Sequence, residues 1–536
     1  TVTLPLVGRE LPVIADDYVD REFGTGALKI TPGHDPNDFE IGRRHGLEEI
    51  SVIGEDGRMT DAAGEYAGLT TQEAQAKVIA ALDEQGLIVS RSDHVHTVPY
   101  SHRSGQRIEP LISLQWFMRM EPLARPAAQA VRDGRVKIHP ESQSRRYLDW
   151  LDNIRPWCIS RQLWWGHRIP AWYCPDGHVT VTSDPGGPPA CDDCARPAAE
   201  MEQDPDIFDT WFSSGLWPFS TLGWPEDTPD LARYYPTSVM ETGYDIIFFW
   251  VARMMMLGLH LTDHEPFHTV YLSGLIRHPD GQKMSKTKGN VVDPLGVIDE
   301  SGADALRFAL VHGATPGQDQ RFGAAKLDNA RHFANKLWNA TRFVVGARPA
   351  SIAADTERRL PDARQLGPGE RWILSRAAAA VTAVDGAMAG YAFGEVTRIL
   401  YDAIWNEFCD WGVELAKVRL ADASLSDAER EATWWTLVEA LDTYLRLLHP
   451  VMPFVTEALW AAIPHRASDP ALLIVARWPG EGERDTDTEA QVEAVLELVR
   501  SVRNARSEAH IEPAAWLATE VALPPALGPT FETLRP

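Results

Sequence analysis

The chain has 536 residues, of which 44% are hydrophobic and 24% charged, so it is a folded globular protein of about three or four domains rather than a collagen-like, low-complexity or disordered one. No run of about 18 uncharged apolar residues is present, so we expect no membrane span, and five cysteines are too few for a disulfide framework, which indicates a cytoplasmic protein. The net charge of −25 argues against a generally basic surface for nucleic acids but not against a local basic groove.

The first 112 residues are expected to be rich in short strands. Apolar residues bounded by turn residues predict strands over 11–15 and 26–30. A helix over 71–85 is expected to end at the glycine that follows it, Gly86.

Another helix of this segment has a clear start and end. Asp35 precedes Pro36 as an N-cap precedes the first helical residue, and Asp38 has the spacing of a capping box. Gly46 is expected to end this helix.

Residues 113–325 alternate strand and helix, which is typical of a parallel α/β sheet. We expect a buried strand over 238–241, a helix over 245–259 and a further strand over 268–272. A proline- and glycine-rich stretch at 184–189 predicts a surface excursion within this region.

From 326 to 536 the pattern is helical and predicts a bundle. Apolar residues recur at helical spacing in two stripes: Phe333, Leu337, Ala340 and Val344, then Ile404, Phe408, Trp411, Leu415 and Val418. Proline, glycine and mixed charges at 350–368 predict a flexible connection.

A lysine-rich loop carries the strongest local chemical signal. Lys283, Lys286 and Lys288 stand around Ser285 and Thr287, and ammonium groups so placed can neutralise a triphosphate and stabilise charge on a pyrophosphate leaving group. For lysines alone, a solvated turn is the alternative. The order Lys-Met-Ser-Lys-Thr, after an α/β strand and before a helical region, resembles the signature loop of the class I aminoacyl-tRNA synthetases. That resemblance implies an ATP site at the three lysines and catalytic roles for Lys283, Ser285 and Lys286.

Three further segments, 152–170, 209–214 and 241–250, resemble the valine–isoleucine–leucine branch of this family. The sequence Trp-Trp-Gly-His at 164–167 is most similar to the valine-specific members. The resemblance implies a Rossmann-like parallel-sheet core, a partial β-rich inserted editing domain before it and a C-terminal α-helical anticodon-binding bundle after it. It also implies ATP-dependent attachment of valine to tRNA(Val) through valyl-adenylate, with Mg²⁺ accompanying the ATP.

By the same resemblance, Trp211, Asp245, Ile246 and Trp250 line the valine pocket. Ile246 and Trp250 are four residues apart and share a helical face, so with Trp211 they would enclose a short branched side chain. Asp245 would pair with the substrate ammonium. An ordinary apolar core stripe is the alternative.

The first segment resembles the editing domain of these enzymes and implies hydrolysis of mischarged threonyl-tRNA. An apolar pocket separates threonine from valine poorly, a limit that valine-specific synthetases themselves illustrate. Asp35 would hold the substrate ammonium, although a plain N-cap is the alternative and the two roles are compatible. The implied editing residues are Phe23, Lys29, Thr31, Asp35 and Asp38.

Cysteine and histidine spacing predicts a zinc knuckle in the insert at 174–194. Cys174 and His178, then Cys191 and Cys194, offer four ligands across the proline- and glycine-rich loop. A degenerate knuckle held by loop packing is the alternative.

The stretch 335–343 resembles the start of the anticodon-binding bundle. Lys336, Arg342 and exposed aromatic residues are candidates for contacts with tRNA phosphates and unstacked bases, with a solvated surface as the alternative. We therefore expect tRNA(Val) and valine as partners, no membrane, and a monomer.

The chain begins at Thr1 rather than at a methionine and ends at Pro536, and we expect a segment that lacks N-terminal and C-terminal parts of the enzyme. The family's His-x-Gly-His element does not occur in this sequence, so the segment alone is expected to be inactive in amino-acid activation. Two rival functions remain: an isoleucine-specific synthetase, which the tryptophans at 164–165, 211 and 250 disfavour, and a non-catalytic tRNA-binding paralogue.

Overall fold

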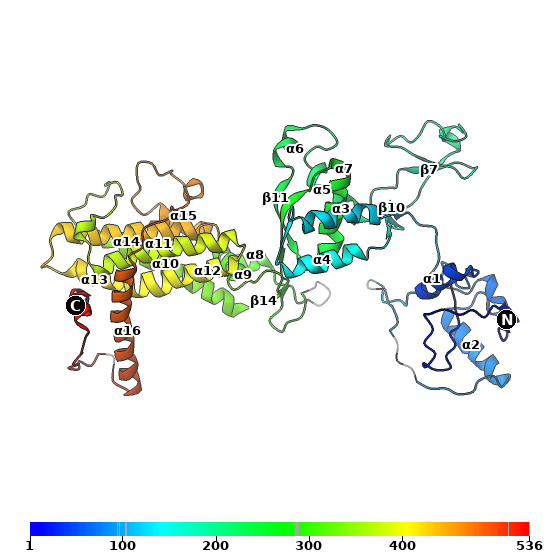
Figure 1. Cartoon of the computed structure of the whole chain (residues 1–536), viewed down its shortest axis with the longest axis horizontal. Coiled ribbons are helices and arrows are strands. Elements are labelled where there is room, and N and C mark those ends of the chain that lie inside the picture. The colour runs from blue at the N-terminus through cyan, green and yellow to red at the C-terminus, as the bar shows by residue number, and fades with distance from the viewer. Residues whose placement is uncertain (94, 96, 102–103, 285–288, 513, 535–536) are drawn as a thin grey trace. The chain divides into compact units, whose positions relative to one another are not determined.

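The computed structural model describes residues 1–93, 95, 97–101, 104–284, 289–512 and 514–534. The chain divides into two compact units (Figure 1): residues 1–117 with 158–160, and residues 118–157 with 161–536. Ser285, Lys286 and Lys288 of the lysine-rich loop lie outside the described residues.

The first unit contains little strand. Its elements are β1 (Val2–Thr3), β2 (Glu10–Leu11), α1 (Pro36–His45), a 3₁₀ turn (Asp61–Tyr66) and α2 (Thr71–Glu84). The strand predicted over 11–15 is limited to its first residue, and the strand over 26–30 is wrong. An extended segment becomes a strand only where a neighbouring strand supplies ladder partners, and no described strand pairs with residues 26–30.

Helix α1 begins and ends where the sequence predicts. Asp35 is its N-cap and accepts hydrogen bonds from the N–H groups of Asn37 and Asp38, and Gly46 ends it at a φ of 64°. The capping box is wrong in one respect, because the Asp38 carboxylate binds Thr31 rather than the N-cap backbone. Helix α2 carries a capping box that the sequence analysis did not name, between Thr70 and Glu73.

The second unit contains the predicted parallel sheet, in the order β11 (Thr237–Gly243), β12 (Phe267–Ser273) and β4 (Lys137–His139). Strand β12 is buried along most of its length, whereas β11 buries only Met240 and Thr242. The strand expected at 238–241 is confirmed, but its expected burial is wrong, because β11 lies at the edge of the described sheet. The helices of the sheet-containing part of the second unit are α3 (Glu121–Arg132), α4 (Ser142–Asp152), α5 (Thr210–Ser220), α6 (Pro229–Tyr234) and α7 (Ala252–Thr262).

The segment between β11 and β12 is helical, as predicted, but not uniformly α-helical. A 3₁₀ turn (Tyr244–Ile246) and a π-helical turn (Ile247–Val251) precede α7. Among the described residues, Tyr244–Thr262 is the one segment long and apolar enough to cross a membrane, and half of it is buried in the protein. Helix α7 packs against α3 and α5, as a core helix does.

The predicted surface excursion at 184–189 lies between two strands of a small antiparallel sheet, β8 (Val179–Val181) and β9 (Glu202–Gln203), which both pair with β7 (Ala171–Tyr173). The remaining short strands are β3 (Phe117–Met118), β5 (Trp157–Cys158), β6 (Ser160–Arg161), β10 (Ile207–Phe208), β13 (Ile276–Arg277) and β14 (Gln320–Arg321).

The helical bundle, drawn largely in yellow and orange in Figure 1, shares one apolar core. Its first predicted stripe, from Phe333 to Val344, is buried as expected. The second stripe holds through Phe408 but then fails, because Val413 and Ala416 are buried in place of Leu415 and Val418. A π-helical stretch (Asp402–Gly412) explains the change, since each π turn adds a residue and shifts the register of the following helix.

The helices of this region are α8 (Pro294–Ser301), α9 (Ala303–Val311), α10 (Ala324–Gly346), α11 (Pro368–Ala389), α12 (Phe393–Tyr401), α13 (Val413–Ala421), α14 (Asp427–Leu448), α15 (Pro453–Trp460), α16 (Thr486–Glu508) and α17 (Gly528–Leu534).

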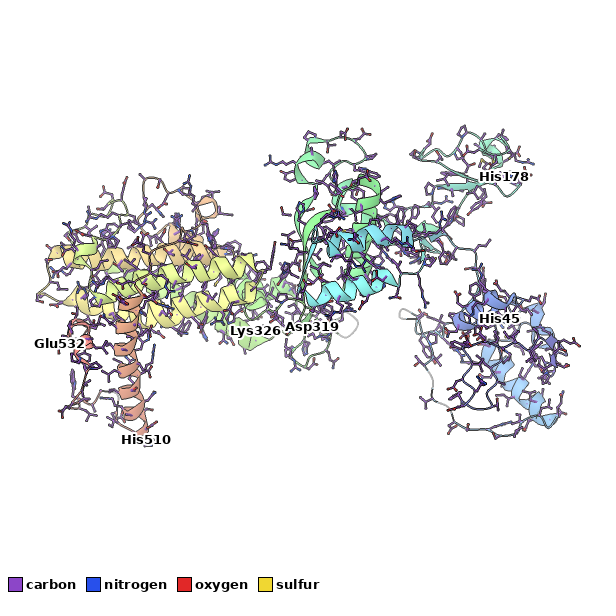
Figure 2. The ribbon with its side chains drawn as sticks, in the orientation of Figure 1. His45, His178, Asp319, Lys326, His510 and Glu532 are labelled. Carbon is purple, nitrogen blue, oxygen red and sulfur yellow. The ribbon has the colours of Figure 1, made fainter. Side chains whose placement is uncertain are left out.

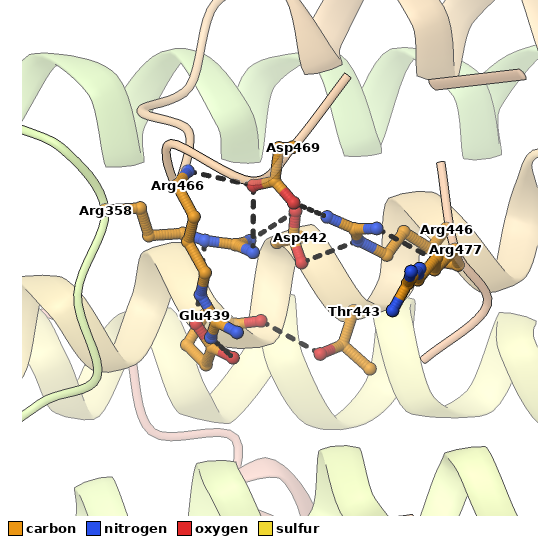
Figure 3. A network of polar contacts seen from close by, with 8 residues as sticks. All are labelled: Arg358, Glu439, Asp442, Thr443, Arg446, Arg466, Asp469 and Arg477. Carbon is orange, nitrogen blue, oxygen red and sulfur yellow. Dashed lines mark hydrogen bonds and ion pairs between the residues drawn. The ribbon is translucent and has the colours of Figure 1, made fainter. Parts of the chain in front are cut away.

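The connection at 350–368, predicted to be flexible, is fixed to the bundle by a buried ion network (Figure 3). The Arg358 side chain is 2% exposed and forms ion pairs with Asp442 on α14, Asp469 and Glu439. Arg446 joins the same network through Asp442 and Asp469, at 2.9 and 2.8 Å. Loop composition alone did not reveal this attachment, because its partners lie about 80 to 110 residues away in the sequence.

Candidate functional site

Four aromatic side chains from α5 and from the segment before α7 lie together where the valine pocket is expected. The ring of Trp211 stacks with Phe249 at 5.9 Å, and Trp250 lies 5.9 Å from Trp217. The Trp250 indole N–H donates to the carbonyl of Ser214 at 3.1 Å. The structure thus brings Trp211 and Trp250 onto neighbouring parts of one apolar wall, with Phe249 as a member that the sequence analysis missed.

Asp245, the expected partner of a substrate ammonium, contacts an ammonium of the protein. Its Oδ2 lies 3.4 Å from Nζ of Lys283, the first lysine of the loop whose next members are undescribed. Both side chains are open to solvent, so this ion pair is weak and readily exchanged. The contact places Lys283 beside Asp245, a proximity that spacing in the sequence does not reveal.

A buried carboxylate, Asp209, connects the elements around this wall. Its Oδ2 accepts hydrogen bonds from the Trp157 indole at 3.0 Å and from Arg161 at 2.6 Å. Its Oδ1 accepts from the backbone N–H of Trp211 at the start of α5. In the sequence, the signal for a structural role of Asp209 was its position just before a helix, since aspartate is a preferred N-cap.

Arg253 lies beside this carboxylate and is largely buried. Its Nη1 is 3.7 Å from Asp209, and its guanidinium lies 3.7 Å above the ring of Trp157. Burial lowers the pKa of Arg253 to about 10, against the opposing charge of Asp209. The sequence signal was a lone arginine in the apolar run from 246 to 262.

In the first unit, three of the five expected editing residues form one chain of contacts. Lys29 Nζ donates to Thr31 Oγ1 at 2.6 Å, and the Thr31 N–H donates to Asp38. Asp35 uses Oδ1 for its capping bonds, whereas Phe23 is 74% exposed. The structure therefore brings Lys29, Thr31 and Asp38 together but does not join Phe23 to them.

Two histidines that the sequence analysis did not select hold this unit. His34 Nε2 accepts from the backbone N–H of Val52 at 2.8 Å, and its Nδ1 contacts the carbonyl of Pro110. His45, labelled in Figure 2, binds Asp16 at 2.8 Å. The Tyr18 backbone N–H, with His45 and Arg44, lowers the pKa of Asp16 to about 2.

The predicted knuckle residues converge in space, near His178 in Figure 2. Sγ of Cys174 lies 3.5 Å from Nδ1 of His178 and 3.7 Å from Sγ of Cys194, and all four ligand atoms lie within 4.8 Å of one another. A tetrahedral zinc with Zn–S of about 2.3 Å and Zn–N of about 2.0–2.1 Å requires S–S and S–N separations of roughly 3.8 and 3.5 Å. The residues present therefore fit a zinc ion.

The backbone also favours a thiolate in this cluster. The N–H groups of Cys194 and Asp193 lower the pKa of the Cys191 thiol to about 6. A deprotonated sulfur is the form that binds a metal ion.

Two family models match this chain. Residues 37–323 match tRNA synthetases class I (I, L, M and V), and residues 370–522 match the anticodon-binding domain of tRNA ligase. Arg358 lies in the stretch between the two matched regions, and its ion-pair partners lie in the second.

Curated relatives match the chain along nearly its whole length. It is 49% identical over 526 residues to the Valine--tRNA ligase of Dehalococcoides mccartyi and 48% identical over 526 residues to that of Streptomyces coelicolor. It is 47% identical over 522 residues to the Valine--tRNA ligase of Geobacillus stearothermophilus. These alignments cover 96–97% of this chain and 57–58% of the relatives, so the chain spans less than two thirds of their length.

Solved structures show a similar fold. The apo methionyl-tRNA synthetase of Mycobacterium tuberculosis matches with a TM-score of 0.53 at 16% identity, over 83% of this chain and 84% of that chain. The same enzyme with methionyl-adenylate matches with a TM-score of 0.51 at 20% identity, over 68% and 66% of the two chains. The predicted order of a parallel-sheet core followed by a helical bundle is confirmed.

Proposed function

Because the chain belongs to the class I tRNA synthetases (I, L, M and V), we propose that it forms part of an enzyme that attaches valine to tRNA(Val) through valyl-adenylate made from ATP. The observation that carries this proposal is the similarity to valine--tRNA ligases along 96–97% of the chain. The aromatic wall of Trp211, Phe249 and Trp250 supports it, since a bulky wall favours a short branched side chain.

The proposed roles of the chain's residues follow from their chemistry. Asp245 pairs with the substrate ammonium, in place of its present partner Lys283. Lys283 is then released toward the ATP phosphates, where its charge and the charges of Lys286 and Lys288 stabilise the leaving pyrophosphate. Mg²⁺ supplies further positive charge at the phosphates when it is bound.

The choice of amino acid is the sharpest test of this function. In the enzyme that contains this chain, valine is expected to bind more tightly than isoleucine and to support exchange of labelled pyrophosphate into ATP. Trp211→Ala should narrow the difference between the two amino acids, because it enlarges the pocket, whereas Trp478→Ala in the bundle should not. Equal affinities for valine and isoleucine in the unchanged enzyme would overturn the assignment.

We also propose that the first unit hydrolyses threonyl-tRNA. The contacts among Lys29, Thr31 and Asp38 support a small polar pocket beside the Asp35 cap. Asp35→Ala is expected to impair deacylation of threonyl-tRNA and to spare valine activation. Asp35→Asn is the matched control for folding, since asparagine also caps helices, and undiminished deacylation in the alanine variant would contradict the proposal.

The third proposal is a structural Zn²⁺ held by Cys174, His178, Cys191 and Cys194. Elemental analysis after dialysis should find about one zinc per chain, as in a closed four-ligand site. Cys191→Ser should abolish retention, whereas Cys409→Ser should not, because Cys409 lies in the bundle core, where burial raises the pKa of its thiol to about 12. A folded, metal-free preparation would leave loop packing as the explanation.

We place the enzyme in the cytoplasm and expect it to be a monomer. All five cysteines are free thiols in the structure, which suits a reducing compartment. Sedimentation of the purified protein tests the oligomeric state.

A further inference from the structure

Helices α9, α10 and α12 enclose a cavity of about 270 Å³ that none of the roles above uses. It is close to the lower limit of small-molecule sites, which is about 300 Å³. Its chemically distinctive lining residues are Phe308, His312, Lys326, Asn329 and Tyr401.

Lys326, labelled in Figure 2, brings an uncompensated charge to this cavity. Its Nζ donates to Oε1 of Gln320 at 2.7 Å and to the carbonyl of His312 at 3.3 Å, both of which are neutral. In the described part of the chain, no carboxylate lies within ion-pairing distance of this ammonium. Burial lowers the pKa of Lys326, as expected for an ammonium without an anion nearby.

Three aromatic rings of the cavity lining lie in a row, which Trp405 extends outside the lining. The His312 ring stacks on Phe308 at 4.9 Å and lies 5.7 Å from Tyr401, which stacks on Trp405 at 5.5 Å. Nδ1 of His312 is buried without a hydrogen-bond partner among the described residues. The nearby acid Asp402 is ion-paired with Arg398 at 2.7 Å and so does not serve as the counter-ion of Lys326.

We propose that this cavity binds a nucleotide, with its phosphate on Lys326 and its base against the rings of His312 and Tyr401. Base stacking on aromatic side chains and phosphate contacts to lysine are the two general means of binding single-stranded nucleic acid. A free nucleotide and an unpaired nucleotide of tRNA share this chemistry, and the second source rests on the proposed function. Asn329, at the exposed rim, supplies amide groups for a base edge.

Two pairs of variants test the site in the full chain, with tRNA(Val) and AMP as separate probes. Lys326→Met should weaken binding of both probes about tenfold and reduce the slope of log K against log salt by about 0.7 for the tRNA, whereas Lys77→Met, on the surface of the first unit, should not. Tyr401→Leu should weaken binding about tenfold, while Tyr401→Phe, which keeps the ring, should bind as the unchanged protein does. Asn329→Leu provides a rim variant that does not disturb the core.

Binding experiments with both probes distinguish a free nucleotide from an unpaired nucleotide of tRNA as the occupant of the cavity. Competition between AMP and tRNA that is lost in Lys326→Met assigns the cavity to a nucleotide of the tRNA, and simultaneous binding with AMP still dependent on Lys326 assigns it to a free nucleotide. Lack of tRNA binding by the unchanged chain, with AMP binding that depends on Lys326, would contradict the proposed function but support the cavity. Unchanged affinity for both probes in folded Lys326→Met, Tyr401→Leu and Asn329→Leu variants would overturn the site.

Discussion

The first unit and the helical bundle are stabilised in different ways. The buried apolar core of the first unit around α2 consists of Ala63, Tyr66 and Ala74, and side chains bound to the backbone, such as Asp35 and His34, hold much of the rest. The bundle buries four tryptophans completely: Trp372, Trp434, Trp435 and Trp460. It also contains the ion network of Arg358 within its packed structure.

This difference teaches where a single polar interaction matters. A hydrogen bond at the surface of a small unit contributes modestly but forms a large share of that unit's stability. A charge inside the bundle has little access to water, so removing its partner leaves it uncompensated. The predictions below test this contrast.

The largest expected effect is at Arg358. Arg358→Met removes the arginine that pairs with all three carboxylates and leaves Asp442 and Asp469 with Arg446 alone. Because this removes a buried charge from a network that needs it, we expect the bundle to lose about 3–5 kcal/mol of unfolding free energy. Arg364→Met is the matched control, since Arg364 is exposed and pairs only with Asp362, and it should change stability by about 0–1 kcal/mol. Chemical denaturation measures the unfolding free energy of both variants. Equal, small losses would show that the network contributes no more to stability than an exposed ion pair.

Two equivalent capping boxes allow a direct comparison of the regions. Thr70→Ala on α2 and Ser426→Ala on α14 each remove an N-cap hydroxyl bound to the third helical residue. Each substitution should lower the unfolding free energy by about 0.5–2 kcal/mol. The melting temperature of the smaller first unit should fall further, because a given loss shifts the midpoint of a small domain more. Calorimetry of the two variants measures both melting temperatures. A larger fall in Ser426→Ala than in Thr70→Ala would contradict this expectation.

A more gradual effect is expected with pH. Burial lowers the pKa values of His312, His449 and His465 below the ordinary 6.5. The unfolded chain then binds protons more readily than the folded bundle, so stability is full above about pH 6.5 and declines as the pH falls below it. The melting temperature should fall between pH 7.5 and pH 5.5. The fall should be smaller in His312→Gln than in the unchanged protein, whereas the exposed-site control His510→Gln should show the same fall as the unchanged protein. A flat profile would contradict it.

Local rules in the sequence predicted the elements that local interactions determine. The limits of α1, the strand at 268–272 and the stripe from Phe333 to Val344 follow from caps and periodicity. The strand at 26–30 did not form, because pairing depends on a partner far away in the sequence. The knuckle ligands were found because their spacing is itself a local pattern.

Contacts over long sequence separations could not be predicted in this way. The approach of Lys283 to Asp245 spans 38 residues, and the attachment of Arg358 to Asp469 spans 111. Arg253 stands in an otherwise apolar run, and the fold places Asp209 beside it. In each case the charge was visible in the sequence, but its partner was not.

The π-helical turn at Ile247–Val251 makes the proposed valine pocket sensitive to chain length as well as to side-chain type. An α-helix advances about 100° per residue, so deleting one residue from this turn would rotate Asp245 and Ile246 by roughly that angle relative to α7. The buried face of α7 would keep its packing against α3 and α5, while the residues before it would face elsewhere. A one-residue deletion or insertion at this position therefore offers natural variation, or a designer, a way to change which side chains meet the substrate without replacing any of them.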